Sequence, residues 1–388
     1  MAERRDHVSG AQIVNQPIDA SLTPARGVLR TEKMTLKEIY EVWSHDLHAA
    51  DVETVAVDSE DNVISGGNDD KVIKADSSGA KLWEHSLHGS NYVYAVAVDS
   101  EDNVISGATD DKVIKTDSTG VELWQEVLSS YPRVIAVDSA DNIIVAVGQE
   151  VVKMDSSGTR LWEHSLHESD YVYAVAVDSE DNVISAGDDD RIIKADSSGA
   201  ELWRHGFHTD TPHQVAADSA NNILSVGYDG LVIKVDSSNS KLWEHSLHGA
   251  VQVRAVAVDS EDNVISGDGS EVIKADSEGA EVWVHSLHSS RVNDVAIDRT
   301  DNVLSASSDD SVIKARDYRP LFDGDVIDSV FTVVSVDGAN SADVSIGGVP
   351  YSAGDRLEIS ARFDVSKLII KGVADDVVYV MAFERQEV

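Results

Sequence analysis

An eleven-residue segment, VAVDSEDNVIS, is written seven times in this chain, either unchanged or with a few substitutions. The unchanged copies begin at Val55, Val96, Val175 and Val256, and the near copies begin at Ile135, Val215 and Val295. Successive copies begin 39 to 41 residues apart. A fixed period of this size is the signature of a repeat architecture, so it limits the possible folds more than any other feature of the sequence.

Each period contains four short apolar runs separated by Asp, Asn, Ser and Gly. In the stretch from Val96 to Trp124 the runs are VAV, VIS, VIKTD and VELW. Short runs rich in Val and Ile and bounded by turn residues are typical of antiparallel strands. None of the repeats shows a sustained helical period. Four strands in about 40 residues correspond to one blade of a β-propeller.

The tryptophans fix the number of blades and the way in which the ring closes. The chain has seven, all at the fourth-strand position, namely Trp43, Trp83, Trp124, Trp162, Trp203, Trp243 and Trp283. Trp43 precedes the first three-strand unit, and no Trp run follows the last unit. We therefore expect the strand YEVWSHDL around Trp43 to complete the blade formed by residues 295–316. The predicted fold is an all-β, seven-bladed propeller closed by an N-terminal strand.

The segments outside the repeats predict two further parts. Residues 1–38 carry Pro17 and Pro24 and little apolar periodicity, which predicts an extended N-terminal arm. Residues 39–317 form the propeller. Residues 318–388 contain five strand-like runs, SVFTVVSV, ADVSIGGV, RLEISA, KLIIKGV and VVYVMAF. These runs predict a small C-terminal β-sandwich or barrel.

The repeat resembles several known propeller families over roughly residues 39–317. The segment SGATDDKVIKTD resembles the second and third strands of a WD repeat, although the Trp of that motif is absent. VAVDSEDNVIS resembles the first hairpin of NHL and SBBP repeats, and KADSSGAKLW resembles the closing hairpin of SBBP and quinoprotein-type repeats. The resemblance implies the propeller fold, which hosts many unrelated functions and therefore implies no single activity.

Twelve of the fourteen histidines form HxxH pairs after a Trp. Residues three apart on a strand point to opposite faces, so the spacing argues against a metal-chelating pair. The second histidine of a pair, for example His88, stands where a WD repeat has a histidine that bonds a Ser and an Asp. Ser106 and Asp110 stand at those positions. Because the arrangement repeats around the ring, we interpret it as structural and not as a catalytic triad. The first histidine, for example His85, is expected to pack between blades.

The composition excludes several functions and points to an environment. The chain has 70 acidic and 31 basic residues, a net charge of −39. Such a charge disfavours nucleic acid and anionic membranes. Concentrated salt screens its self-repulsion, which indicates a halophilic source, a haloarchaeon or one of its viruses; an acidic surface selected for solubility is the alternative. There is no Cys, and the first residues have no apolar core, so we expect no secretory signal. We expect neither cofactor nor metal site, because the acidic turns match no calcium-loop motif and are the usual place for Asp.

These features predict a non-enzymatic structural or interaction protein whose propeller displays a binding surface within a larger assembly. The assembly could be a virion, with the chain in its tail, baseplate or spike for attachment to a host surface protein or glycan. The arm and the C-terminal domain would contact the other subunits. The alternatives are a scaffold propeller in the cytoplasm of a haloarchaeon and a ligand-binding or quinone-dependent propeller enzyme. The last requires blade-specific polar residues at the channel mouth, and the near identity of the copies argues against them.

One blade departs from the pattern. After Trp124 the sequence reads WQEVLSSYPRV, so both histidines and the following DDK turn are lost. Interfaces are depleted in acidic residues and enriched in Tyr. We therefore expect an exposed edge at Tyr131, Pro132 and Gln149 to contact a protein partner. The alternative is a repeat that has merely drifted.

The charge gives a first testable prediction. If the acidic excess is an adaptation to salt, the melting temperature should climb steeply between low and molar KCl, because the counterions screen repulsion among the carboxylates. Thermal unfolding followed by circular dichroism over a KCl series measures this dependence. A flat curve would contradict the halophilic interpretation.

Overall fold

The computed structural model describes residues 41–168, 170–249 and 251–316 with their side chains, and the backbone of further strands outside these ranges. The chain divides into two compact units. One comprises Glu41–Ala315, and the other combines Met1–Tyr40 with Arg316–Val388. No helix in the described part of the chain is long and apolar enough to cross a membrane.

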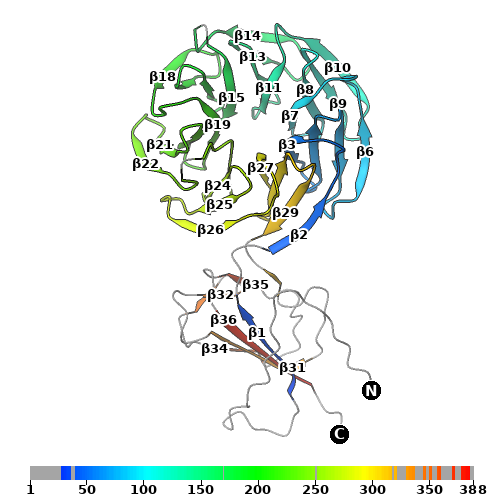
Figure 1. Ribbon diagram of the computed structural model, residues 1–388, viewed down its shortest axis with the longest axis vertical. Coiled ribbons are helices and arrows are strands. Elements are labelled where there is room, and N and C mark those ends of the chain that lie inside the picture. Colours follow the sequence, from blue (N-terminus) through cyan, green and yellow to red (C-terminus); the bar gives the residue numbers. More distant parts are fainter. Residues whose placement is uncertain are drawn as a thin grey trace. The chain divides into compact units, whose positions relative to one another are not determined.

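The larger unit is a seven-bladed β-propeller (Figure 1). Each blade is a four-stranded antiparallel sheet, and we number the blades 1 to 7 in the order of the sequence copies. Six blades use four consecutive strands. In blade 7, strand β2 (Tyr40–His45) pairs with β29 (Val312–Arg316), so an N-terminal strand completes the last sheet. The prediction of seven blades closed by the strand around Trp43 is confirmed.

The strands follow the repeat. The innermost strands of blades 1 to 7 are β3 (Val52–Val57), β7 (Val93–Val98), β11 (Pro132–Val137), β15 (Val172–Val177), β19 (Pro212–Ala217), β23 (Ala255–Val258) and β27 (Val292–Ile297). The second strands are β4 (Val63–Gly67), β8 (Val104–Ala108), β12 (Ile143–Val147), β16 (Val183–Gly187), β20 (Ile223–Gly227), β24 (Val264–Gly267) and β28 (Val303–Ser307). The third strands are β5 (Val72–Ala75), β9 (Lys112–Thr116), β13 (Glu150–Met154), β17 (Ile192–Ala195), β21 (Val232–Val235), β25 (Val272–Ala275) and β29. The outer strands are β6 (Lys81–His85), β10 (Glu122–Val127), β14 (Arg160–His164), β18 (Glu201–His205), β22 (Lys241–His245), β26 (Glu281–His285) and β2.

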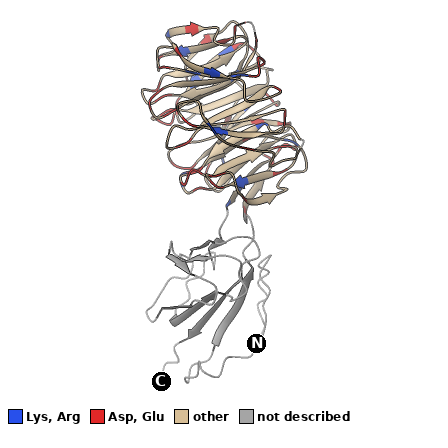
Figure 2. Ribbon diagram, turned by 90° about the vertical axis from the view of Figure 1, so that its left-hand side faces the viewer, with Lys and Arg blue, Asp and Glu red and all other residues tan. Residues whose placement is uncertain are grey.

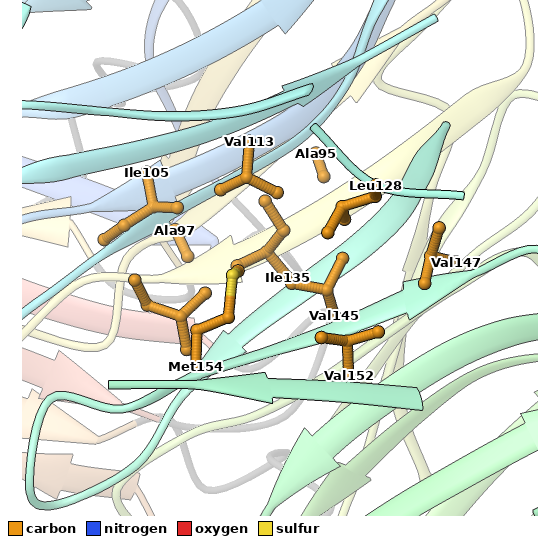
Figure 3. Close-up of a cluster of buried hydrophobic side chains, with 11 residues drawn as sticks. Ala95, Ala97, Ile105, Val113, Leu128, Ile135, Val145, Val147, Val152 and Met154 are labelled. Atoms are coloured by element: carbon orange, nitrogen blue, oxygen red, sulfur yellow. The ribbon is translucent and has the colours of Figure 1, made fainter. Parts of the chain in front are cut away.

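The hydrophobic core lies between neighbouring blades. Every residue of the second strands is buried, because each central strand is covered on both faces. Figure 3 shows the cluster between blades 2 and 3, in which Ile105 and Val113 of one blade pack against Ile135, Val145 and Met154 of the next. The outer strands are largely exposed, and the acidic residues are found mainly along turns and edges (Figure 2).

The repeated segment forms a turn that is held from inside by one ion pair. In blade 1, Asp58 Oδ1 accepts the amides of Glu60 and Asn62, while Oδ2 accepts Asn62 Nδ2 at 2.8 Å and pairs with Lys74 Nζ at 2.7 Å. The side chains of Lys74 and Asp58 are 5% and 1% exposed. The pair recurs in the other six blades as Lys115–Asp99, Lys153–Asp138, Lys194–Asp178, Lys234–Asp218, Lys274–Asp259 and Lys314–Asp298.

The same turns are linked to one another around the ring. Ser59 donates from its amide and from Oγ to the carboxylate of Asp102 in the next turn, at 2.8 and 2.7 Å. Similar bonds join every later pair of turns before the closing joint, and at one of them the acceptor is the side-chain oxygen of Asn221 in place of a carboxylate. At the closing joint Arg299 replaces the Ser, and its amide donates to Asp61 at 3.1 Å. One short segment thus makes both the turn and the joint between blades, which explains why the chain repeats it.

The outer strands also hold neighbouring blades together. His88 of the loop after β6 bonds Ser106 and Asp110 of blade 2, each at 2.9 Å. Trp83 donates from Nε1 to the carbonyl of Ser118, in the hairpin of the same neighbouring blade, at 3.0 Å. The predicted histidine network is confirmed. Most of the tryptophans are half-buried on the outer strands, where their indoles bridge to the next blade.

The closure of the ring interrupts this series of indole hydrogen bonds at blade 6. Trp283 of blade 6 is 2% exposed, and among the described residues its Nε1 has no hydrogen-bond partner. The carbonyl that the other tryptophans bond lies in the hairpin between a third and an outer strand. In blade 7 those two strands come from opposite ends of the propeller sequence, so this hairpin does not exist.

The terminal unit contains two four-stranded sheets, ordered β1-β36-β31-β34 and β30-β35-β32-β33. Their strands are β1 (Val28–Thr35), β30 (Arg319–Pro320), β31 (Ser329–Val336), β32 (Val344–Ile346), β33 (Val349–Tyr351), β34 (Arg356–Ile359), β35 (Ile369–Lys371) and β36 (Val377–Glu384). Every C-terminal run predicted as strand contains one.

The N-terminal arm differs from the prediction. An extended arm was expected over residues 1–38, but Val28–Thr35 pairs antiparallel with β36. The pairing brings together segments more than 300 residues apart, and local sequence carries no signal for such a partner. The rest of the predicted arm lies outside the described residues.

The ion pair gives a second testable prediction. Lys74→Met leaves the Asp58 carboxylate buried without its cation, so the free energy of unfolding should fall by about 3–5 kcal/mol. Lys81→Met is the matched control, because Lys81 pairs with Glu84 on the exposed outer strand and such pairs contribute about 0–1 kcal/mol. Urea unfolding of both variants measures the two changes. Equal changes would show that the buried pair does not stabilise the blade.

Candidate functional site at the mouth of the central channel

A cavity of about 460 Å³ opens at the end of the central channel where the innermost strands begin. All seven blades contribute residues to its wall. Binding sites for small ligands are typically concave and of this size. The cavity is therefore the candidate functional site.

The channel-facing position of the repeat carries a chemically distinct set of side chains. It lies one residue after the Val or Pro that opens the innermost strand sequence, and it is occupied by Glu53, Tyr94, Arg133, Tyr173, His213, Arg254 and Asn293 in blades 1 to 7. The residues before and after this position remain mostly Val, Ile, Ala or Pro. The expectation that near-identical copies would leave no blade-specific polar residues at the channel mouth is therefore wrong.

Tyrosines gather at this mouth. Of the six tyrosines between residues 41 and 316, four line the cavity, namely Tyr94, Tyr131, Tyr173 and Tyr228. The ring of Tyr171 lies 5.8 Å from the Arg133 guanidinium of the same wall. Tyr94 and Tyr131 approach with ring centroids 5.9 Å apart. The His213 ring stacks on Tyr228 at 5.1 Å and meets Tyr173 at 5.9 Å. The mouth is thus an aromatic surface, of the kind enriched in binding sites.

Three arginines line the same cavity, and two of them lie over tyrosine rings. The Arg133 guanidinium lies 4.4 Å from the centre of Tyr173 and donates to the Tyr131 hydroxyl at 2.6 Å. Arg254 lies 4.8 Å from the centre of Tyr228. Arg291 donates to the Asn293 side-chain oxygen at 2.7 Å. Cation–π contacts of this kind hold a guanidinium in place without neutralising its charge.

The channel arginines differ from those on the outer strands. Within the described residues, none of Arg133, Arg254 and Arg291 forms an ion pair with a carboxylate. Arg160 and Arg204 on the outer strands each pair with two glutamates. Among the described residues Lys112, Arg191 and Arg299 also have no ion pair, but Arg133, Arg254 and Arg291 lie together in one cavity. Their concentration in one cavity favours binding of an anion.

His213 is held neutral beside these cations. Its Nδ1 donates to the Arg254 carbonyl at 3.0 Å, which leaves Nε2 unprotonated. Desolvation within the channel, and secondly the charge of Arg254, lower the pKa of His213 to about 4. Desolvation likewise raises the pKa of Tyr94 and of Tyr173. At neutral pH the mouth therefore presents hydroxyl donors, a neutral imidazole and fixed guanidinium charges.

A polar plug spans the channel. The Asp294 carboxylate accepts hydrogen bonds from the Val55 amide at 3.0 Å, the Val295 amide at 2.9 Å, Gln214 Nε2 at 2.9 Å and Thr54 Oγ1 at 3.2 Å. Four donors occupy both of its oxygens. Asp294 therefore ties blades 1, 5 and 7 together and has no oxygen left to act as a base.

The predicted partner residues do not form one exposed edge. Pro132 is buried against Gly107 of blade 2. The two residues are so close that a Cβ added to Gly107 would lie 2.5 Å from the Pro132 side chain. Tyr131 is half-buried and lines the channel cavity, while Gln149 is exposed in the turn between β12 and β13. Tyr131, the residue before β11, lines the channel and does not lie on the outer rim of the propeller. A partner contact through these residues stays a prediction, with Tyr131 now placed in the cavity.

Blade 3 has replaced its histidine network by apolar packing. Val145 stands where the other blades have the bonded Ser, and Leu128 packs against it in the cluster between blades 2 and 3. Ser129, at the position of the second histidine, is exposed. The lost polar contacts are thus offset by burial of side chains, which accounts for the altered sequence without a partner.

The channel residues left a signal that sequence reasoning missed. Aligning the seven copies from Val52 or its equivalent shows a column that varies in charge and aromaticity directly after a column that is always Val or Pro. The next column also varies, with Thr54, Gln214 and Asp294 among Ala and Val. A column that diverges within an otherwise uniform repeat marks a position whose side chain does not have to pack against the neighbouring blade. Only the ring closure brings the seven side chains of that column together.

The lowered pKa of His213 gives a third testable prediction. An unfolded histidine titrates near pH 6.5, whereas the folded one titrates near 4, so between these values only the unfolded state takes up the proton and stability is lost as pH falls. Arg133, Arg254 and Arg291 all lie close enough to oppose protonation. His213→Asn should therefore lose less stability than the parent between pH 6.5 and 4. Parallel denaturant titrations measure it, and identical pH slopes would contradict the assignment.

Comparison with known proteins agrees with this architecture. Residues 40–168 and 140–319 match the family model described as outer membrane protein assembly factor BamB. No curated protein matches the chain. Among solved structures, the crystal structure of the WD40 β-propeller domain of Doa1 is similar with a TM-score of 0.64 at 17% identity, over 72% of this chain and 97% of that one. The likeness to the Doa1 domain shows the fold alone. The family matches together span most of the chain, and the chain therefore belongs to the family of BamB-like propellers.

Proposed function

We propose that this protein is a non-enzymatic interaction protein that binds its partner at the mouth of the propeller channel. The observation that carries the proposal is the divergence of the channel-facing position in a chain that is otherwise nearly uniform around the ring. Four tyrosines and three arginines without carboxylate partners line the same cavity. Rigid aromatic residues and arginines contribute most of the binding energy in protein interfaces.

The chemistry of the channel supports binding more than catalysis. A general base needs a free lone pair and a pKa near the working pH. Asp294 has both oxygens occupied by hydrogen-bond donors. His213 is held by its hydrogen bond to the Arg254 carbonyl and has a pKa of about 4. The serines bonded to histidine repeat around the ring and are buried, so no single one is set apart as a nucleophile.

The similar proteins support a protein partner. β-Propellers, including WD40 domains, commonly mediate protein interactions, and the matching family is described as an assembly factor. A quinone-dependent enzyme is the alternative from the same resemblance. Within the described part of the chain, no group of three or more His, Asp and Glu residues could hold a metal ion for such a cofactor. We therefore assign that alternative no residues.

A more specific proposal concerns the assembly or compartment in which the protein binds its partner. Membership of a virion tail, baseplate or spike, with attachment to a host protein or glycan, rests on the acidic charge and the added terminal unit. So does the alternative of a scaffold in the cytoplasm of a haloarchaeon. Subunit contacts through the arm and the C-terminal domain belong to the same proposal. Sedimentation of extracts from the source, with antibody detection of the chain in particle or free fractions, separates the two settings.

A fourth prediction tests the channel mouth directly. A photoreactive phenylalanine analogue at Tyr92, which is 48% exposed in the loop before β7 and two residues from Tyr94 of the cavity wall, should form a discrete adduct in extracts of the source cells. The same analogue at Leu82, 53% exposed on the outer strand, is the matched control. Gel electrophoresis and mass spectrometry identify the adducts. Adducts from Leu82 with none from Tyr92 would move the binding surface to the rim.

A further inference from the structure

The innermost strands expose backbone amides to the channel. Each of these strands pairs on one side only, so every second N–H group points away from its sheet. Four of these amides are occupied. Val55 and Val295 donate to Asp294, Val96 donates to Thr54 Oγ1 at 3.3 Å, and Val256 donates to Gln214 Oε1.

The acceptor follows a simple rule. In three of the four cases the acceptor belongs to the blade before it in the ring. It is the side chain one residue before the position in that blade that corresponds to the amide donor. These side chains are Thr54, Gln214 and Asp294. In blades 2, 3 and 4 the same position holds Ala95, Val134 and Ala174, which have no acceptor atom. Among the described residues, the amides of the three blades that follow, those of Ile135, Val175 and Val215, therefore receive no side-chain acceptor.

Asp294 shows what fits such a gap. Its two carboxylate oxygens accept the equivalent amides of two neighbouring blades, at 2.9 Å within blade 7 and 3.0 Å from blade 1. The same geometry repeats around the ring. A carboxylate supplied from outside would therefore fit between the amides of Ile135 and Val175, which both line the cavity.

The charge and the rings on this side of the channel match that group. Arg133 stands two residues before Ile135 on the same strand, without a carboxylate partner, and Tyr94 and Tyr173 flank it. Backbone amides together with a guanidinium form strong, charge-assisted bonds to an oxyanion. We infer that the channel wall of blades 3 and 4 binds the carboxylate of a ligand through Arg133 and the amides of Ile135 and Val175.

The cavity also limits the rest of the ligand. Glu53 and Asp294 line the same space, so a second negative charge on the ligand would be repelled. The tyrosine rings favour a flat or apolar body beside the charged group. The ligand class is a monovalent carboxylate with such a body, either a small organic acid or the C-terminal residue of a peptide. This inference rests on the proposed binding function and names the chemistry of its site.

Two pairs of probes test it on the full chain at one fixed KCl concentration. Benzoate is compared with benzamide, and acetylated alanyl-alanyl-phenylalanine with a free C-terminus is compared with its amide. Isothermal titration calorimetry measures binding. Benzoate, the free-acid peptide or both should bind, and the neutral analogues should not. Binding of benzoate alone identifies a small organic acid as the source, and binding of the peptide acid alone identifies a peptide end.

Two variants locate the site. Arg133→Gln removes the cation and should weaken binding by about tenfold to a hundredfold. Val134→Asp supplies a carboxylate at the position equivalent to Asp294, so it should fill the gap from within and abolish binding. Arg160→Gln on the outer strand is the matched control. Circular dichroism establishes that each variant is folded, and Arg133→Gln keeps the test valid if Val134→Asp does not fold.

The opposing results are equally definite. Equal binding of benzoate and benzamide, or unchanged binding by Arg133→Gln, would overturn the inference. So would the absence of binding by both acids at up to about 10 mM, well above the range of a specific site. Adducts from Tyr92 together with no carboxylate binding would leave the proposed interaction standing and reject only the ligand chemistry.

Discussion

The fold depends on a lysine and an aspartate that are buried together in every blade. Each charge is expensive to remove from water, and the cost is offset only where the pair is complete and further hydrogen bonds satisfy the remaining atoms. Asp58 meets this condition with two backbone amides, an asparagine and Lys74. The Lys74 ammonium also reaches the Ser118 carbonyl of the next blade at 3.4 Å. Because every atom of the pair has a role, little variation is tolerated, and the segment that contains it recurs almost unchanged.

Closure of the ring turns this local constraint into a global one. Each joint between turns, each histidine network and each indole bond joins one blade to the next, so no blade is complete alone. The last joint needs an outer strand for blade 7, and the strand around Trp43 supplies it. Where the chain must break the pattern, the substitutions are specific. Arg299 replaces a serine at the joint, and Trp283 has no neighbouring hairpin to bond.

The channel is where the repeat is released from these constraints. Its wall is made of strand edges, and side chains there need not pack against a neighbouring blade. Polar side chains such as Asp294 bridge one sector, and the sector of blades 3 and 4 keeps alanine and valine below Arg133. The asymmetry of the cavity arises from these few substitutions on a uniform frame. Stability and binding are therefore separated in space: the outer turns and strands hold the ring, and the inner edge presents the chemistry.

The sequence by itself determined the blade number, the closing strand and the histidine network. Each of these follows from a spacing or from a residue type that recurs at every copy, such as His88 with Ser106 and Asp110. It also marked Tyr131 as unusual, although on the wrong surface. Only the tertiary structure decided which residues meet in the channel, because seven side chains about 40 residues apart converge only when the ring closes. The partner of Val28–Thr35 was beyond the sequence for the same reason: strand pairing over so long a separation is selected by the folded surroundings and not by the local pattern.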